Sequence, residues 1–212
     1  MQINKSSLEH SEFFRDGMGT EGVAPFLRSL IGLVKPKRIL EIGIGYTTPF
    51  LIDGINNNSK NFIEEINMNK SYYESGNHNE PAKLIIIDDN SLDNQINEKV
   101  SSKLKKCNFL EYIEGKFQGK GKYLFEKYGL FDFVWFDCGG AKEYSEFIRE
   151  YWRYCNDYVI FHFTYTDGSP NSLMYTLHKE LPIVDKNNIH RIDIVEPHKR
   201  RQGSITMLRK AP

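Results

Sequence analysis

Apolar and polar positions follow one another in blocks along the chain, and the blocks predict strands separated by helices. Five apolar runs read as strands: residues 38–42, 83–88, 108–115, 131–137 and 158–163. The run KLIIID at 83–88 is almost entirely aliphatic, as expected for a parallel strand that is buried on both faces. Residues 190–210 read as two further strands around a turn with Gly203, which predicts an antiparallel hairpin.

Helical periodicity fills the spaces between the first strands. We expect a helix over residues 21–34 with Thr20 as its cap, and Pro36 then ends it. Ser91 begins another, because residues 92–104 carry an apolar side chain at every fourth position and so form one stripe. Strand and helix therefore alternate along the first half of the chain.

Two further helices are expected in the second half of the chain. Residues 141–155 carry aromatic side chains at helical spacing. Ser169 and Pro170 suit the N-cap and first position of a helix over 172–181. The pattern as a whole predicts an α/β fold: a Rossmann-like, mostly parallel seven-stranded sheet with helices on both faces and a C-terminal antiparallel hairpin.

One polar segment interrupts this rhythm within the single domain, residues 1–212, that the pattern predicts. Residues 53–82 are rich in Asn, and a short helix is expected at 61–70. A surface insertion is the simpler interpretation, because long irregular segments in compact domains are uncommon. A lid or a homodimer contact is the functional alternative.

Composition excludes some classes of partner. The chain has 28 basic and 28 acidic side chains, so its formal net charge is zero. A general nucleic-acid or anionic-membrane binder normally carries an excess of basic residues, so we expect neither partner. Hydrophobic residues make up 40% of the chain, enough for a globular core.

Cysteine usage and the lack of long apolar runs bear on location. Cys107, Cys138 and Cys155 are far apart and form no CxxC pair, which is typical of reduced thiols rather than of a disulfide framework or zinc site. The first 14 residues contain no apolar core of a signal peptide, and no run approaches the ~20 residues that span a bilayer. We therefore expect a cytoplasmic protein.

The segment RILEIGIGYTTPF, residues 38–50, carries the main chemical signal. An acid, Glu41, ends an apolar strand, and Gly43 and Gly45 follow at alternate positions. Glycine lets a ligand approach the backbone closely because no Cβ intervenes. A dinucleotide fingerprint is GxGxxG, but here the third glycine is absent and Pro49 stands where the helix should begin. A pyrophosphate cradle is therefore disfavoured.

Together, three segments resemble the class I S-adenosylmethionine-dependent methyltransferases. ILEIGIGYTTPFL is similar to the first motif of that family, in which an acid precedes Gly-x-Gly. LIIIDDN is similar to its second strand, which ends in an acid that binds ribose hydroxyls, and FDFVWFDCGG resembles its fourth strand. The resemblance covers roughly residues 18–209, and the layout is closest to small-molecule O-methyltransferases of the catechol type.

The resemblance implies S-adenosylmethionine as the cofactor and identifies candidate binding residues. Asp88 is the choice for the ribose, since it continues the alternation of the second strand. MGTEG, residues 18–22, is similar to the segment that closes over the cofactor in that family. The full set of candidates is Glu41, Gly43, Gly45, Tyr46, Thr47, Thr48, Asp88, Lys116, Phe117 and Asp137.

The end of the fifth strand departs from the family pattern. Catechol-type enzymes hold a divalent metal with an Asp-Asn pair there, whereas this chain reads VIFHFTYTDG. Magnesium prefers oxygen ligands, so we expect no metal; a transition metal bound by His162 and Asp137 is the alternative. His162 and Asp137 are the catalytic candidates, with His162 as a base for the acceptor proton. A satisfied, half-buried histidine is the structural alternative.

A basic turn, EPHKRRQGS, lies between the last two expected strands, a region that shapes the acceptor pocket in many family members. Arginine binds carboxylates and phosphates bidentately, so an anionic acceptor would fit, although a solvated surface turn is the slightly favoured interpretation. Candidate substrate-binding residues are Tyr144, Tyr165, His198 and Arg201.

The sequence therefore predicts methyl transfer from S-adenosylmethionine to oxygen or nitrogen of a small molecule. A non-catalytic binder of the same cofactor is one alternative, because the Asp-Asn pair is missing. An aminopropyltransferase is another, but the acids are few for a polyamine and the basic turn opposes one. An RNA methyltransferase is disfavoured by the zero net charge.

Overall fold

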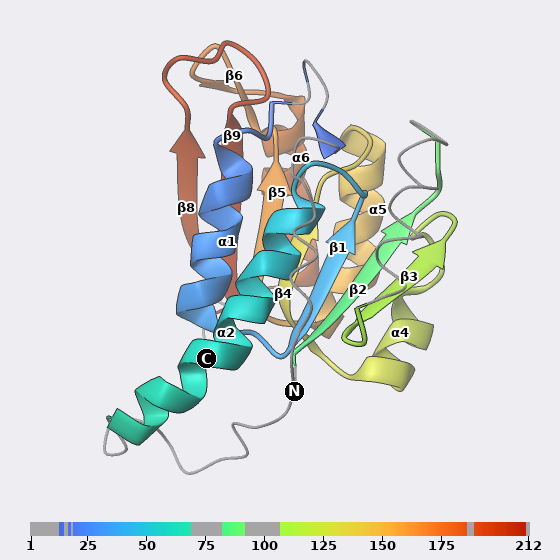
Figure 1. Ribbon diagram of the computed structural model, residues 1–212. Coiled ribbons are helices and arrows are strands. Elements are labelled where there is room, and N and C mark those ends of the chain that lie inside the picture. Colours follow the sequence, from blue (N-terminus) through green and yellow to red (C-terminus); the bar gives the residue numbers. More distant parts are fainter. Residues whose placement is uncertain are drawn as a thin grey trace.

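A seven-stranded sheet forms the centre of the protein, shown as a computed structural model in Figure 1. The structure describes residues 13–14, 17, 19–68, 82–91, 107–185 and 189–210. The strand order is β3-β2-β1-β4-β5-β9-β8, in which β9 runs opposite to the other six strands. The strands are β1 (Arg38–Ile42), β2 (Lys83–Asp88), β3 (Leu110–Glu114), β4 (Phe131–Phe136), β5 (Cys155–His162), β8 (Ile189–Val195) and β9 (Ser204–Lys210). The sheet has the predicted mostly parallel architecture with its C-terminal hairpin.

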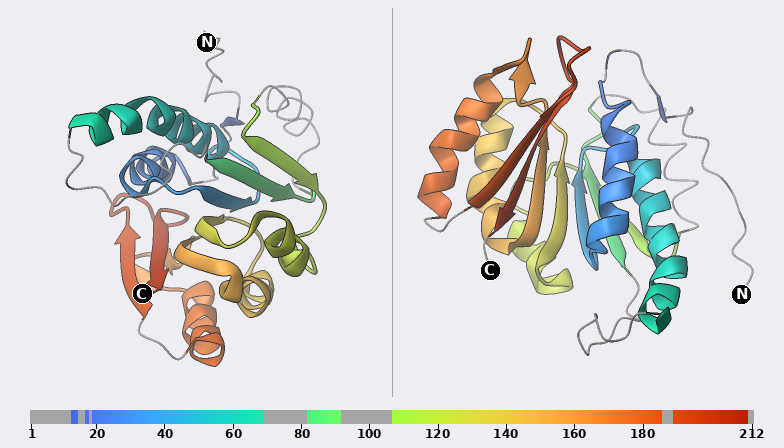
Figure 2. Two further views of the ribbon diagram at one scale, coloured as in Figure 1. Left: turned by 90° about the horizontal axis from the view of Figure 1, so that it is seen from below. Right: turned by 90° about the vertical axis from the view of Figure 1, so that its left-hand side faces the viewer.

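Helices cover both faces of the sheet, as Figure 2 shows from two directions. α1 and α2 lie against one face, and α4, α5 and α6 lie against the other. The helices are α1 (Val23–Val34), α2 (Thr48–Met68), α4 (Gly121–Tyr128), α5 (Ala141–Tyr151) and α6 (Ser172–Val184). A 3-10 helix, Trp152–Tyr154, extends α5. None of the helices in the described ranges is long and apolar enough to cross a bilayer.

The expected helix start at Ser169 and Pro170 is wrong by two residues. These residues form β7 (Ser169–Pro170), which pairs with β6 (Tyr165–Thr166) in a small hairpin. Asn171 is the N-cap of α6 instead, because its side-chain oxygen accepts hydrogen bonds from the backbone N–H groups of Leu173 and Met174. Because Ser169 and Pro170 are used by the hairpin, the helix begins two residues later than the local sequence predicts.

The polar segment 53–82 is partly a continuation of a regular element. Its residues 53–68 belong to α2, whose helix also contains most of the short helix expected at 61–70. Asn58 ties α2 to α1, since its Nδ2 donates to the carbonyl oxygen of Ile31 at 2.8 Å. Residues 69–81 lie outside the described residues, as does most of the helix expected after Ser91.

The chain order creates a switch point at the centre of the sheet. β1 is flanked by β2 on one side and β4 on the other, and all three run in the same direction. From β1 the chain continues to β2 and β3 on one side and then crosses to β4 and β5 on the other side. The crevice at the carboxyl ends of β1 and β4 is therefore the expected ligand site of such a sheet. The β8–β9 turn reaches the same end, because Ile205 of β9 pairs with His162, the last residue of β5.

An aromatic cluster fills the core beneath α5. Phe147 has no exposed surface, and its ring lies 4.5 Å from that of Phe136 and stacks on Tyr151 at 5.1 Å between centroids. Aromatic side chains contribute large buried areas, so this cluster should dominate the packing of the α5 face.

We expect Phe147→Ala to lower the free energy of unfolding by about 3–5 kcal/mol, because it leaves a cavity inside this cluster. Tyr123→Ala is the matched control, since Tyr123 is 52% exposed on α4 and its loss should cost less than about 1 kcal/mol. Urea denaturation of both variants measures the difference. Equal losses would contradict a tightly packed α5 face.

Candidate active site at the carboxyl ends of β1, β2 and β4

The two glycines of the turn after β1 serve different purposes. Gly43 has φ +94°, and a Cβ placed there would lie 2.4 Å from the carbonyl oxygen of Asp137. No side chain fits between the turn and the end of β4, so Gly43 is required for that close approach. Gly45 has nothing within 4 Å of its would-be Cβ, so it borders open space. Gly45 therefore offers bare backbone to a ligand.

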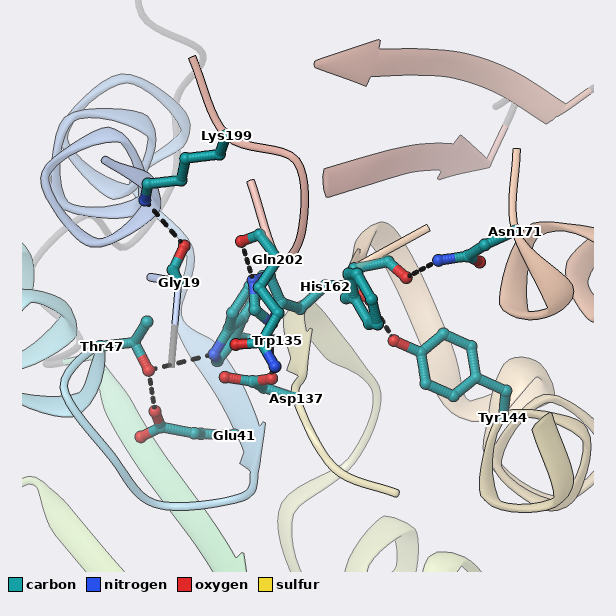
Figure 3. Close-up of polar contacts among 11 residues, drawn as sticks. Gly19, Glu41, Thr47, Trp135, Asp137, Tyr144, His162, Asn171, Lys199 and Gln202 are labelled. Atoms are coloured by element: carbon teal, nitrogen blue, oxygen red, sulfur yellow. Dashed lines mark hydrogen bonds and ion pairs between the residues drawn. The ribbon is translucent and has the colours of Figure 1, made fainter. Parts of the chain in front are cut away.

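Glu41 is a fully buried acid beneath this turn. Its Oε1 accepts hydrogen bonds from the hydroxyls of Thr47 and Thr48, each at 3.0 Å. The indole N–H of Trp135 donates to the Thr47 hydroxyl at 3.1 Å (Figure 3). Within the described part of the chain, Oε2 of Glu41 has no partner. The threonines therefore brace one oxygen of Glu41 and leave the other unsatisfied.

Burial sets the charge of Glu41. Desolvation raises its pKa to about 8, although the two threonine hydrogen bonds oppose the shift and nearby Asp137 and Asp88 add to it. At neutral pH the protonated form of Glu41 is therefore favoured, because a charged Glu41 would be desolvated and repelled by Asp88 and Asp137. A cationic group bound at this place would favour the charged form instead.

Asp88 ends β2 and faces the same turn. Its carboxylate accepts backbone hydrogen bonds from Ile44 at 2.9 Å and Asn90 at 2.8 Å. Burial raises its pKa, and those two bonds lower it in part. Each carboxylate oxygen has two lone pairs, so acceptor sites remain for hydroxyl groups. Asp88 is held in place with capacity left for a diol.

His162 and Asp137 form a bonded pair beside the turn. Nδ1 of His162 lies 2.8 Å from Oδ1 of Asp137, and Nε2 lies 3.0 Å from the carbonyl oxygen of Gln202. A carbonyl only accepts, so Nε2 carries hydrogen. Burial alone would lower the pKa of His162, but the charge of Asp137 and the bonds to Asp137 and Gln202 raise it overall. Both ring nitrogens are therefore engaged, which favours a positioning role over proton abstraction.

Two of the predicted aromatic contacts lie in the core instead of at the site surface. Tyr144 is 2% exposed, and its hydroxyl donates to the carbonyl oxygen of His162. Phe117 is 4% exposed and packs edge-on against Phe136. Neither side chain has a surface to offer a ligand, so Tyr144 supports the end of β5 and Phe117 supports the core.

Three other predicted residues, Tyr46, Lys116 and Tyr165, are at least partly exposed. Tyr46 is half-buried between the rings of Phe14 and Phe50, and Lys116 is exposed. The Tyr165 hydroxyl donates to Oδ2 of Asp193 at 3.0 Å, so it is already partnered.

The basic turn divides into exposed and anchored residues. His198 and Arg201 are exposed. Lys199 is half-buried in a cluster with Glu21 and Glu196, and with Gln202 it was not among the predicted site residues. Lys199 and Glu21 are 178 positions apart, so no local pattern of the sequence identifies their contact.

The described residues also bear on whether the chain could hold a metal ion. The described ranges contain no group of three or more His, Cys, Asp or Glu side chains arranged to hold a metal ion. Metal independence remains a prediction. It rests on the ligand types, because magnesium prefers oxygen ligands and the strand-five end presents an imidazole.

The buried Glu41 predicts how stability depends on pH. Its pKa is about 8 in the folded protein and 4.5 when unperturbed, so between these values only the folded protein holds the proton. This contribution to stability is complete below the unfolded pKa and is lost as the pH rises toward about 8, at up to ~1.4 kcal/mol per pH unit.

Glu41→Gln keeps the shape of the side chain and removes this titration. Urea denaturation from roughly pH 5 to 9 should show the wild type losing stability relative to the variant, with a constant difference above the window. A difference that is independent of pH would contradict a buried, protonated Glu41.

Comparisons with known proteins bear on the fold. No protein-family model matches the sequence, and the comparison with curated protein sequences found no match. The SAH-bound Podospora anserina methyltransferase PaMTH1 superposes with a TM-score of 0.62 at 16% identity, over 99% of this chain and 89% of that one. A Bacillus cereus O-methyltransferase in complex with SAH gives 0.61 at 17% identity, over 90% and 81%.

A third structure is a biosynthetic enzyme. The O-methyltransferase TomG from Streptomyces achromogenes, involved in tomaymycin synthesis and crystallised with S-adenosylmethionine, gives a TM-score of 0.58 at 14% identity, over 99% of this chain and 90% of that one. At these identities the likeness establishes the architecture. The chain has the fold of the S-adenosylmethionine-dependent O-methyltransferases.

Proposed function

We propose that this protein transfers a methyl group from S-adenosylmethionine to an oxygen or nitrogen of a small molecule. The observation that carries the proposal is the convergence of Glu41, Asp88 and Asp137 around the bare backbone of Gly45. Three acids around a glycine turn favour a cationic ligand and disfavour a pyrophosphate. S-Adenosylmethionine carries a sulfonium, an ammonium and a ribose diol, so its chemistry fits this set of groups.

Each group of the site has a part in holding this cofactor. Asp88 would accept hydrogen bonds from the ribose hydroxyls, because its backbone contacts leave acceptor sites. The unsatisfied oxygen of Glu41 lies beneath the turn, and a cation bound above it would favour the charged form of this acid. When bound, S-adenosylmethionine supplies an electrophilic methyl group.

Asp137 is our choice for the residue beside the acceptor. Its side chain is 23% exposed, and Oδ1 is held by Nδ1 of His162. The second oxygen can therefore accept a hydrogen bond or proton from an acceptor hydroxyl or amine. His162 orients this carboxylate, while alignment of the acceptor supplies much of the rate acceleration.

The acceptor is a small molecule, and the rim of the site suggests an anionic one. His198 and Arg201 are exposed on the β8–β9 turn and are available to a carboxylate or phosphate. The Nζ of Lys199 contacts Glu21 and Glu196 instead, so Lys199 is not available to bind the acceptor. The zero formal charge of the chain still disfavours a nucleic-acid acceptor.

Calorimetric titration with S-adenosylhomocysteine tests the cofactor assignment. We expect micromolar binding by the wild type and about 10- to 100-fold weaker binding by Asp88→Asn, because charged hydrogen bonds to the ribose are lost. Asp89→Asn is the matched control, since Asp89 is the exposed neighbouring acid. Binding of a nicotinamide dinucleotide, with none of S-adenosylhomocysteine, would contradict the proposal.

Removal of metal separates this protein from catechol-type enzymes. We expect EDTA to leave S-adenosylhomocysteine binding and methyl transfer to a panel of small phenols, acids and amines unchanged, because an imidazole stands where the Asp-Asn pair is absent. Activity that EDTA abolishes and magnesium restores would overturn metal independence. Tight cofactor binding without turnover on any acceptor would favour the non-catalytic alternative.

A further inference from the structure

The turn between β8 and β9, residues 196–203, is tied to the segment that precedes α1. The Nζ of Lys199 lies 3.2 Å from the carbonyl oxygen of Gly19, 2.6 Å from Oε2 of Glu21 and 3.1 Å from Oε2 of Glu196. An ammonium group has three N–H donors, and these three acceptors match them in number. Lys199 therefore acts as a structural clamp between distant parts of the chain.

Close packing reinforces this clamp. Gly19 has φ +72°, and a Cβ at this position would lie 2.2 Å from Cβ of Gln202 and 2.6 Å from its carbonyl oxygen. The backbone of Gly19 thus lies directly against Gln202, with no room for a side chain between them. A displacement of Gly19 would therefore displace Gln202 as well.

Gln202 connects the turn to His162 in the candidate site. Its carbonyl oxygen accepts the hydrogen of Nε2 of His162, whose opposite nitrogen contacts Asp137. Figure 3 shows the contact between Lys199 and Gly19 and, beside it, the contact between Gln202 and His162, whose ring lies next to Asp137. Hydrogen bonds therefore fix the ring of His162 on both sides, and the bond to Gln202 depends on the position of the turn.

We propose that Lys199 is a positioning residue for methyl transfer: by clamping the turn to Gly19 and Glu21, it keeps the Gln202 carbonyl on His162 and so fixes Asp137. The significance for methyl transfer rests on the function proposed above, whereas the positioning of His162 can be measured without any ligand. Charged neighbours of the ring are Asp137 at the end of β4, Lys199 on the turn and Glu21 before α1.

Nitrogen-15 NMR of the His162 imidazole tests the positioning directly. In the wild type the Nε2 hydrogen should exchange slowly with water, because Gln202 holds it in a buried site. We expect Lys199→Met to speed this exchange about tenfold or more, together with the backbone amide exchange of residues 19–24. Lys199→Arg should restore slow exchange, since it retains a charged donor.

Lys127→Met is the matched control. Lys127 makes an ion pair of the same length, 2.6 Å, with Glu111 on the surface of α4 and β3. Its loss should leave His162 unchanged. If Lys199→Met fails to fold, Glu21→Gln weakens the same clamp from the other side and leaves the contact between Lys199 and Glu196 in place.

Titration of the same variants with S-adenosylhomocysteine, followed by methyl transfer to the acceptor panel, connects the clamp to the site. Faster exchange of His162 with several-fold slower methyl transfer supports the proposal. Unchanged exchange in folded Lys199→Met and Glu21→Gln overturns it, and so does faster exchange with an unaltered rate of transfer. A wild type that binds no S-adenosylhomocysteine but shows the clamp effect on His162 would remove the proposed function and keep the positioning role.

Discussion

The close approach of the β1 turn to the end of β4 is the constraint on which the site depends. The backbone of Gly43 lies so near the Asp137 carbonyl that a Cβ would come within 2.4 Å of it. This contact brings the ends of β1 and β4 together and leaves the next glycine, Gly45, beside open space. Asp88 then anchors the turn from the other side through the N–H of Ile44. The ligand surface is therefore made of backbone, with acids around it.

Those acids give the site its chemical preference. Burial and two neighbouring carboxylates raise the pKa of Glu41 to about 8, so the fold retains a group that costs stability as the pH rises. Such an arrangement is typical of functional sites, where local electrostatics are set by what must bind. A cation relieves the repulsion and an anion increases it. The same physical reasoning disfavours a dinucleotide, for which the missing third glycine is independent evidence.

The sequence predicted the parts of the site that are local. Strands 38–42 and 83–88 have the predicted bounds, because an aliphatic run between polar residues is a strong signal for a buried parallel strand. Glu41, Gly45 and Asp88 follow directly from these strands. The cap of α6 was misplaced, since Ser169 and Pro170 suit both a helix start and the hairpin that they form.

Long-range contacts could not be predicted in this way. Phe117 is a candidate because it follows the third strand, and Tyr144 because it lies at the site end of its helix. Packing decides whether a ring faces the core, and both rings are buried. The ion pair of Lys199 and Glu21 joins the two ends of the chain. A basic turn and an acidic helix start are common surface features, and only the fold shows that they meet beside His162.

The most direct test of this account is a crystal structure of the protein with S-adenosylhomocysteine. The account predicts a ligand at the carboxyl ends of β1, β2 and β4. Both of its ribose hydroxyls should lie within hydrogen-bond distance of Asp88, and its amino-acid moiety should lie beside Gly45. A ligand bound elsewhere, or one at this edge with Asp88 turned away from the ribose, would contradict it.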